Sequence, residues 1–211
     1  MPSTYRYLLA LLLSASFTTT VRADASAPQF VVAPADTSSV PLPAASKQAA
    51  AVSDPFAKGS RYWSVTAGGS RNASIARVYF TQINVSYYLV DNLAIDCGGI
   101  FGYADAKRAQ GGVIGGPELG VRWHVAKGKR WSTYMEGVAG ALFQQHPLTE
   151  QSLRFNFDLQ PGVGATCCLS KNTVFQGGFR WHHLSNARIH GKVHNFGYDG
   201  PLLYLELMRS F

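Results

Sequence analysis

The stretch RFNFDLQ, residues 154–160, alternates polar and apolar side chains without a break. The even positions are polar, and the odd positions are two phenylalanines and a leucine. Because successive side chains of a β-strand point to opposite faces, this alternation predicts a strand with one polar and one apolar face. The polar face carries both signs of charge, since it includes Arg154 and Asp158.

The same two-residue period recurs along the chain from Ser60 to the C-terminus, and none of it has a convincing helical period. The sequence therefore predicts eight strands, near residues 60–68, 76–90, 93–104, 113–125, 131–144, 154–168, 173–186 and 202–211. Short connections near 90–92, 126–129 and 170–172 alternate with longer ones near 69–75, 105–112, 145–153 and 187–200.

This pattern favours an all-β fold, an eight-stranded antiparallel transmembrane β-barrel of the outer membrane with a polar, filled lumen. The segments are long enough to cross a bilayer at a tilt, and short turns alternate with longer loops as in such barrels. The chain ends on an aromatic residue, Phe211, after an alternating strand. The mixed charges of the polar faces are expected to pair inside the narrow lumen. The alternative is an exported soluble β-sandwich or lipocalin-like barrel with the apolar faces inside.

The N-terminal part of the sequence predicts export. Arg6 precedes the short apolar run YLLALLLSASF, which is followed by small residues suited to cleavage, so residues 1–23 are interpreted as a signal peptide. Residues 24–58 are rich in Ala, Pro and Ser and predict a flexible extension, which leaves 59–211 for the barrel. Without the signal the chain has 17 basic and 12 acidic residues. An exported protein with this charge fits an anionic surface, and a nucleic-acid partner is not expected.

Neither a disulfide framework nor a metal site is expected. The chain has three cysteines, of which Cys167 and Cys168 are adjacent in sequence and poorly placed to pair with each other. His190 and His194 have a spacing that two metal ligands on a helix can have, but no carboxylate or thiolate stands near them at ligand spacing.

The seventh segment contains RWHHLSN, in which strand alternation separates two neighbouring histidines. The parity of the segment places His182 on the lumen side and His183 on the outer wall together with Ser185. Counting back along the eighth segment gives Asp199 the same outward parity. A histidine that is held by an acid can activate a serine as a nucleophile. The alternative is that the three polar residues simply lie in the headgroup zone above the hydrocarbon.

The motif HLSNA at 183–187, followed by NFGYD at 195–199 and an alternating last strand, resembles the outer-membrane lipid A 3-O-deacylases, the PagL family. The resemblance implies an eight-stranded barrel and release of a 3-hydroxy fatty acid from the 3-position of lipid A. It implies that Ser185 is the nucleophile, His183 the base and Asp199 the acid, with Asn186 as a candidate oxyanion-hole donor. No cofactor is required by this chemistry.

The chain departs from the family pattern at two positions. The acid is commonly Glu in the family and is Asp199 here, and Arg188 stands where the family often has Gly. Glu206 is an alternative acid, although its parity points into the lumen. Loop cations are candidates for attracting substrate phosphates: Arg188 and Lys192, with Lys107 and Arg108 as weaker ones.

The expected function is therefore an ester hydrolase that takes lipopolysaccharide (lipid A) from the surrounding outer-membrane lipid. Two alternatives remain at this point: a non-enzymatic barrel with a structural or adhesive role, and a barrel acyltransferase that passes the acyl group to another acceptor. A homodimer is compatible with the sequence, and so is a monomer.

Overall fold

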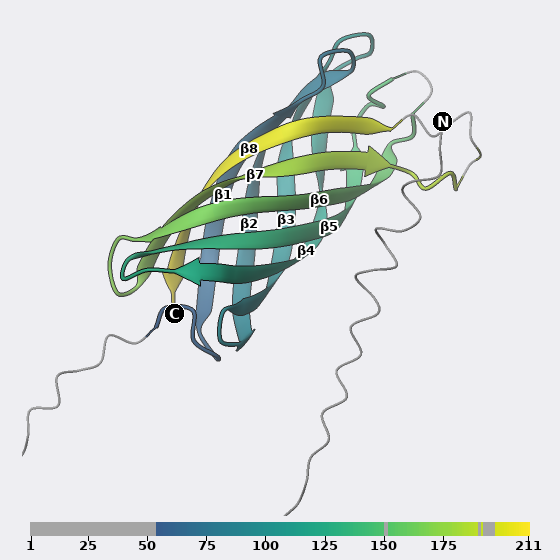
Figure 1. The fold of residues 1–211 in the computed structure, drawn as a ribbon. Coiled ribbons are helices and arrows are strands. Elements are labelled where there is room, and N and C mark those ends of the chain that lie inside the picture. The colour runs from purple at the N-terminus through teal and green to yellow at the C-terminus, as the bar shows by residue number, and fades with distance from the viewer. Residues whose placement is uncertain (1–53, 150–151, 190, 192–196) are drawn as a thin grey trace, which may run out of the picture. The chain divides into compact units, whose positions relative to one another are not determined.

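The computed structural model describes residues 54–149, 152–189, 191 and 197–211. The described residues belong to one compact unit, residues 48–211. Within it, eight strands pair with their chain neighbours, and the first pairs with the last, to give a closed antiparallel barrel (Figure 1). In the described part of the chain, no helix has the length and apolar character needed to cross a membrane. The predicted signal peptide and most of the predicted extension lie outside the described residues.

The strands agree closely with the alternating segments of the sequence. Their bounds are β1 Arg61–Arg71, β2 Ala76–Val90, β3 Leu93–Ala106, β4 Gly112–Lys127, β5 Trp131–Gln144, β6 Phe155–Cys168, β7 Thr173–Ser185 and β8 Tyr198–Ser210. The prediction of eight antiparallel strands is confirmed.

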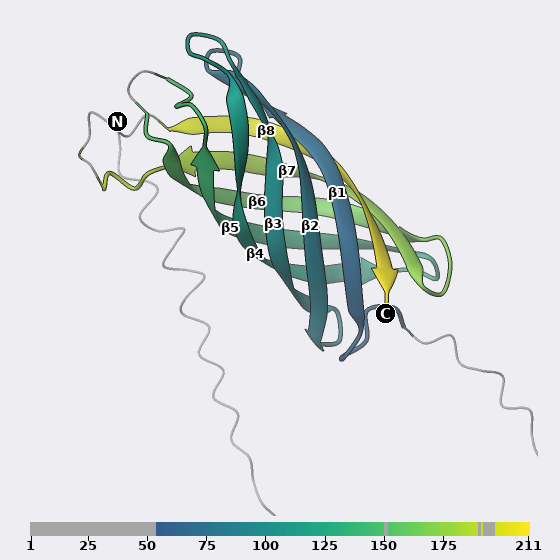
Figure 2. The same cartoon turned by 180° about the vertical axis from the view of Figure 1, so that it is seen from behind.

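The two ends of the barrel differ in their connections. At one end, here called the turn end, the strands are joined by residues 91–92, 128–130 and 169–172, and the chain terminates at Phe211. At the other, the loop end, the connections are residues 72–75, 107–111, 145–154 and 186–197. Figures 1 and 2 show the C-terminus at the turn end, and β7 ending at the loop end. Every odd-numbered strand therefore runs towards the loop end.

The interior of the barrel is polar and the wall outside it is apolar, as the sequence predicted. Arg180 donates to both carboxylate oxygens of Glu136, at 2.8 and 3.0 Å. Arg122 lies 3.2 Å from a carboxylate oxygen of Asp96 and 3.3 Å from one of Glu206. These side chains are buried, whereas the large apolar side chains of the alternate positions are exposed. Such an arrangement suits a lipid environment, because the buried charges pair with one another.

Two strand ends differ from the prediction by several residues. β1 continues to Arg71 instead of residue 68, and β8 begins at Tyr198 instead of residue 202. Both extensions contain glycines, Gly69 and Gly200 among them. A glycine has no side chain to show the polar-apolar alternation, so the sequence pattern fades where the backbone pairing continues.

The last residues of the predicted extension, 54–58, pack against the turn end of the barrel. Phe56 is buried and its ring stacks on His124 at a centroid distance of 3.8 Å. The backbone N–H of Asn92 donates to the carbonyl of Phe56 at 2.8 Å, and Lys127 forms an ion pair with Asp54. The part of the extension next to β1 therefore covers the polar interior at this end.

Candidate active site on the outer wall

The β7–β8 hairpin brings His183 and Asp199 together at the loop end. The two residues are direct partners in the β7–β8 ladder, and Nδ1 of His183 lies 2.8 Å from Oδ1 of Asp199. Both side chains are partly exposed on the outer wall. Because the carboxylate accepts, Nδ1 of the neutral imidazole carries the proton, and Nε2 is left as the basic nitrogen.

Asp199 is held from three directions. The indole Nε1–H of Trp181 donates to the same carboxylate oxygen, Oδ1, at 3.2 Å. The side-chain amide of Asn72 donates to the backbone carbonyl of Asp199 at 2.7 Å. The preceding residue, Tyr198, is buried and its hydroxyl lies 2.8 Å from the Ser70 hydroxyl. The contacts of Trp181 and Asn72 with Asp199 were not predicted from the sequence, because they depend on how β8 is aligned with β7 and β1.

Ser185 is the last residue of β7 and lies two residues after His183 on the same outward face. Two-residue spacing on a strand separates the Cα atoms by roughly 6.5–7 Å. In the described part of the chain the Ser185 hydroxyl makes no hydrogen bond to His183. Catalytic hydrogen bonds are often long in the absence of substrate, so this spacing is compatible with proton transfer once substrate is bound.

His182 lies on the opposite side of the wall, as the alternation predicts. Its side chain is 0% exposed, and its Nδ1 lies 2.7 Å from the Ser70 hydroxyl. Its other nitrogen, Nε2, lies 3.2 Å from a carboxylate oxygen of Asp158. Glu206, the alternative acid, also belongs to the interior, where it pairs with Arg122. Of the candidate acids, Asp199 is the one that contacts His183.

The family comparison matches this site and the barrel around it. A family model described as lipid A 3-O-deacylase (PagL) matches residues 77–206, which include the whole of β7 and most of β8. The chain belongs to the PagL family.

Several solved structures are similar in fold to this PagL member. Neisserial surface protein A is 11% identical with a TM-score of 0.52, over 72% of this chain and 96% of that one. The outer membrane protein W of E. coli is 9% identical with a TM-score of 0.49, over 74% of this chain and 99% of that one. The comparison with curated proteins gives no match. The likeness to the Neisserial protein shows the fold, and with the family it places this PagL member in the bacterial outer membrane as a β-barrel.

The turn after Ser185 has a constrained backbone. Ala187 and Arg188 have positive φ angles of 52° and 63°, which is the left-handed region that side chains disfavour. The side-chain oxygen of Asn186 accepts the backbone N–H of Arg188 at 2.9 Å. The Arg188 N–H is thus engaged within the turn in this structure. A glycine would adopt these φ angles without strain, whereas Ala187 and Arg188 carry side chains there.

The remaining predicted residues are placed as follows. Asn186 is 1% exposed, so its side chain is buried within the turn. Arg188 is exposed next to the site. Lys192, His190 and His194 lie outside the described residues. Over the ranges that the structure describes, no group of three or more His, Cys, Asp or Glu residues is arranged to hold a metal ion.

Proposed function

We propose that the protein is a carboxylic ester hydrolase that removes the 3-position hydroxyacyl chain of lipid A, with Ser185 as the nucleophile. The contact between His183 and Asp199 carries this proposal. It lies on the outward face, two residues from Ser185, where an activated serine meets lipid and not the barrel interior.

The reaction follows from the roles of the three groups. As the Ser185 hydroxyl attacks the ester carbonyl, Nε2 of His183 takes its proton, and Asp199 stabilises the imidazolium that forms. The tetrahedral intermediate then collapses, and His183 protonates the sugar oxygen that leaves. In the second half, water attacks the acyl-serine while His183 again accepts a proton. The 3-hydroxy fatty acid departs, and the Ser185 hydroxyl is restored.

The developing oxyanion needs a hydrogen-bond donor, and Asn186 remains our candidate. Its carbonyl oxygen accepts the Arg188 N–H, and a side-chain amide can donate to an oxyanion only through its NH₂. The positive φ angles at Ala187 and Arg188 support a functional turn, because such strain at non-glycine residues concentrates at active sites.

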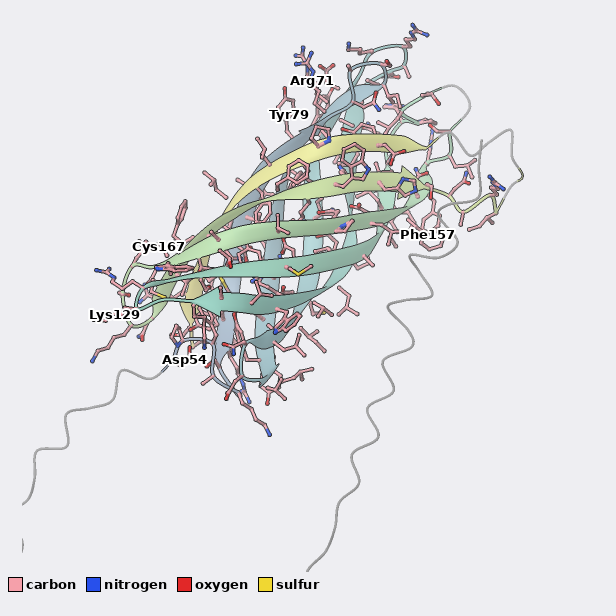
Figure 3. The ribbon with its side chains drawn as sticks, viewed as in Figure 1. Asp54, Arg71, Tyr79, Lys129, Phe157 and Cys167 are labelled. Carbon is pink, nitrogen blue, oxygen red and sulfur yellow. The ribbon has the colours of Figure 1, made fainter. Side chains whose placement is uncertain are left out.

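The wall beside Ser185 is suited to acyl chains. Phe157 is the direct β6 partner of Ser185 and is exposed at the loop end (Figure 3). The ring centroids of Phe157 and Phe155 lie 5.2 Å apart, and those of Phe155 and Phe143 also lie 5.2 Å apart. We propose that the loop end faces outward in the outer leaflet, so that lipid A reaches Ser185 laterally and lays acyl chains on these rings.

Mass spectrometry of lipid A tests the proposal. The full chain is expressed in the outer membrane of a bacterium whose lipid A keeps its 3-position chain, and it is compared with Ser185→Ala and His183→Ala. The control is Ser170→Ala, which changes an exposed serine at the turn end. We expect wild type and the control to remove the mass of one hydroxyacyl group, and both site variants to leave lipid A intact.

Three other outcomes contradict the proposal in different ways. Deacylation by Ser185→Ala would exclude this nucleophile. Unchanged lipid A with wild type and Ser185→Ala alike, both shown to be folded by their shifted mobility in unheated gels, would favour a non-enzymatic barrel. A gain of acyl mass elsewhere in the lipid would favour an acyltransferase.

A further inference from the structure

Two arginines face each other at the loop end of the barrel, one strand beyond the candidate active site. Arg71 and Arg77 are direct partners in the β1–β2 ladder, and both are exposed. Their odd parity places them on the outward face, with the exposed Trp63 and Tyr79 of the same strands. Figure 3 shows Arg71 at this end of β1. Like charges directly opposite each other destabilise an antiparallel pair, so this arrangement has a cost in the free protein.

Among the residues that the structure describes, little offsets this charge. Lys107 adds a third cation. Its ammonium group donates to the carbonyl of Ala73, which places it at the tip of the β1–β2 hairpin. One carboxylate, Asp105, is the β3 partner of Arg77. Among the described residues, no carboxylate lies within ion-pair distance of Arg71, Arg77 or Lys107. The cluster therefore keeps an excess of two positive charges on the outer wall.

Backbone contacts place this cationic cluster, which consists of Arg71, Arg77 and Lys107, next to the candidate active site. β1 is the neighbour of β8 in the closed barrel, as the rear view in Figure 2 shows. The residue after Arg71, Asn72, donates to the carbonyl of Asp199 at 2.7 Å. A Cβ at Gly200 would lie 2.7 Å from the carbonyl oxygen of Arg71, so the two chains run in close contact. With strands about 4.8 Å apart, the arginines stand one and two strands from Asp199.

We infer that Arg71 and Arg77, assisted by Lys107, bind a phosphate group of the lipid substrate and thereby position its ester at Ser185. The inference rests on the proposed function. Guanidinium groups bind phosphate with paired N–H donors, and two opposed guanidinium groups gain most when an anion lies between them. The opposed charges on β1 and β2 are thus complementary to a headgroup phosphate, whose acyl chains extend along the apolar wall below.

A double variant, Arg71→Gln with Arg77→Gln, tests this site in the full-length protein in detergent micelles. The control is Lys129→Gln with Lys171→Gln, which removes the same charge from exposed positions at the turn end. Substrates are lipid A and lipid A from which the phosphates have been removed chemically. We expect the arginine variant to raise the apparent KM for lipid A by about thirty-fold, on the basis of roughly 1 kcal/mol per cation, with little change in kcat. On dephosphorylated lipid A it should match wild type and the control.

Binding is measured separately, in the Ser185→Ala background, so that the result does not depend on catalysis. The arginine variant should lose affinity for lipid A and not for the dephosphorylated lipid. Equal affinities for lipid A with and without the two arginines would overturn the inference, and so would an equal loss for both lipids. If wild type binds through the arginines but hydrolyses neither lipid, the phosphate site stands and the proposed hydrolysis fails.

Discussion

Trp181 and His183 donate to the same carboxylate oxygen of Asp199, from the same face of β7. An aspartate is one methylene shorter than the glutamate common in the family, so its placement depends more on the backbone and on neighbouring donors. Trp181 supplies such a donor from the strand that carries the base. We therefore regard Trp181 as a positioning residue, which acts on the substrate only through Asp199 and His183.

Replacing Trp181 with Phe should remove the donor and keep the apolar ring. A hydrogen bond to a charged acceptor contributes about 1.5–3 kcal/mol, and the half-exposed setting reduces this to about 1 kcal/mol, so kcat should fall roughly fivefold. KM should stay unchanged, because the indole is not a substrate contact in this scheme. Trp123→Phe, an exposed outward tryptophan on β4, is the control. A rise in KM at constant kcat would instead make Trp181 part of the lipid-binding surface.

At the residue scale, the sequence predicted on which side of the barrel wall His182 and His183 lie. The alternation of β7 alone is sufficient, because Phe179 and Trp181 mark the outward parity and Arg180 marks the inward one. The contact between Trp181 and Asp199 could not be predicted, because it depends on the register between β7 and β8. In that register Leu184 pairs with Tyr198, which is buried and which alternation placed in a loop.

At the scale of the strands, the glycines on the lumen side show how closely the backbones approach. Gly98 of β3 pairs with Asn84 of β2, and a Cβ there would lie 2.0 Å from the carbonyl oxygen of Ile83. Such a distance cannot be relieved by rotating a side chain, since the obstacle is backbone. The pairing of β2 with β3 therefore needs glycine at this position.

Gly98→Ala should weaken the barrel severely, by about 3 kcal/mol or more, because overpacking here must shift a strand. Gly137→Ala is the matched control, since a Cβ at that exposed position meets no atom within 4 Å. The heat-dependent gel mobility of each variant after refolding into detergent reports the folded fraction. Equal folded fractions would show that β3 can move away from β2 at little cost.

At the scale of the whole barrel, buried polar and charged side chains join non-adjacent strands across the lumen. Arg180 of β7 contacts Glu136 of β5 with two hydrogen bonds, and it also donates to Gln82 of β2 at 3.1 Å. The sequence predicted a lumen of mixed, paired charges. The identity of the partners could not be predicted, because it depends on how far the strands are staggered around the closed barrel.

Arg180→Met should destabilise the barrel by roughly 3 kcal/mol, because it leaves Glu136 buried with one of its two cationic neighbours lost. Arg154→Met, at an exposed arginine before β6, is the control and should change stability by less than about 0.5 kcal/mol. Urea unfolding in lipid vesicles gives the free energy of unfolding for each. If only the control, Arg154→Met, had a lower free energy of unfolding than wild type, the role of the buried pair would be contradicted.

The hydrogen bond from Asn72 to the carbonyl of Asp199 crosses the seam where β1 meets β8. These strands are the first and last of the barrel, so the seam can close only after the C-terminal strand has been delivered to the assembling wall. The proposed acid lies on the last strand, and one of its anchors directly follows the first. The contact between His183 and Asp199 needs only the β7–β8 hairpin, whereas the hydrogen bond from Asn72 exists only once the seam has closed, so closure of the barrel should tighten an acid and a base that are already paired.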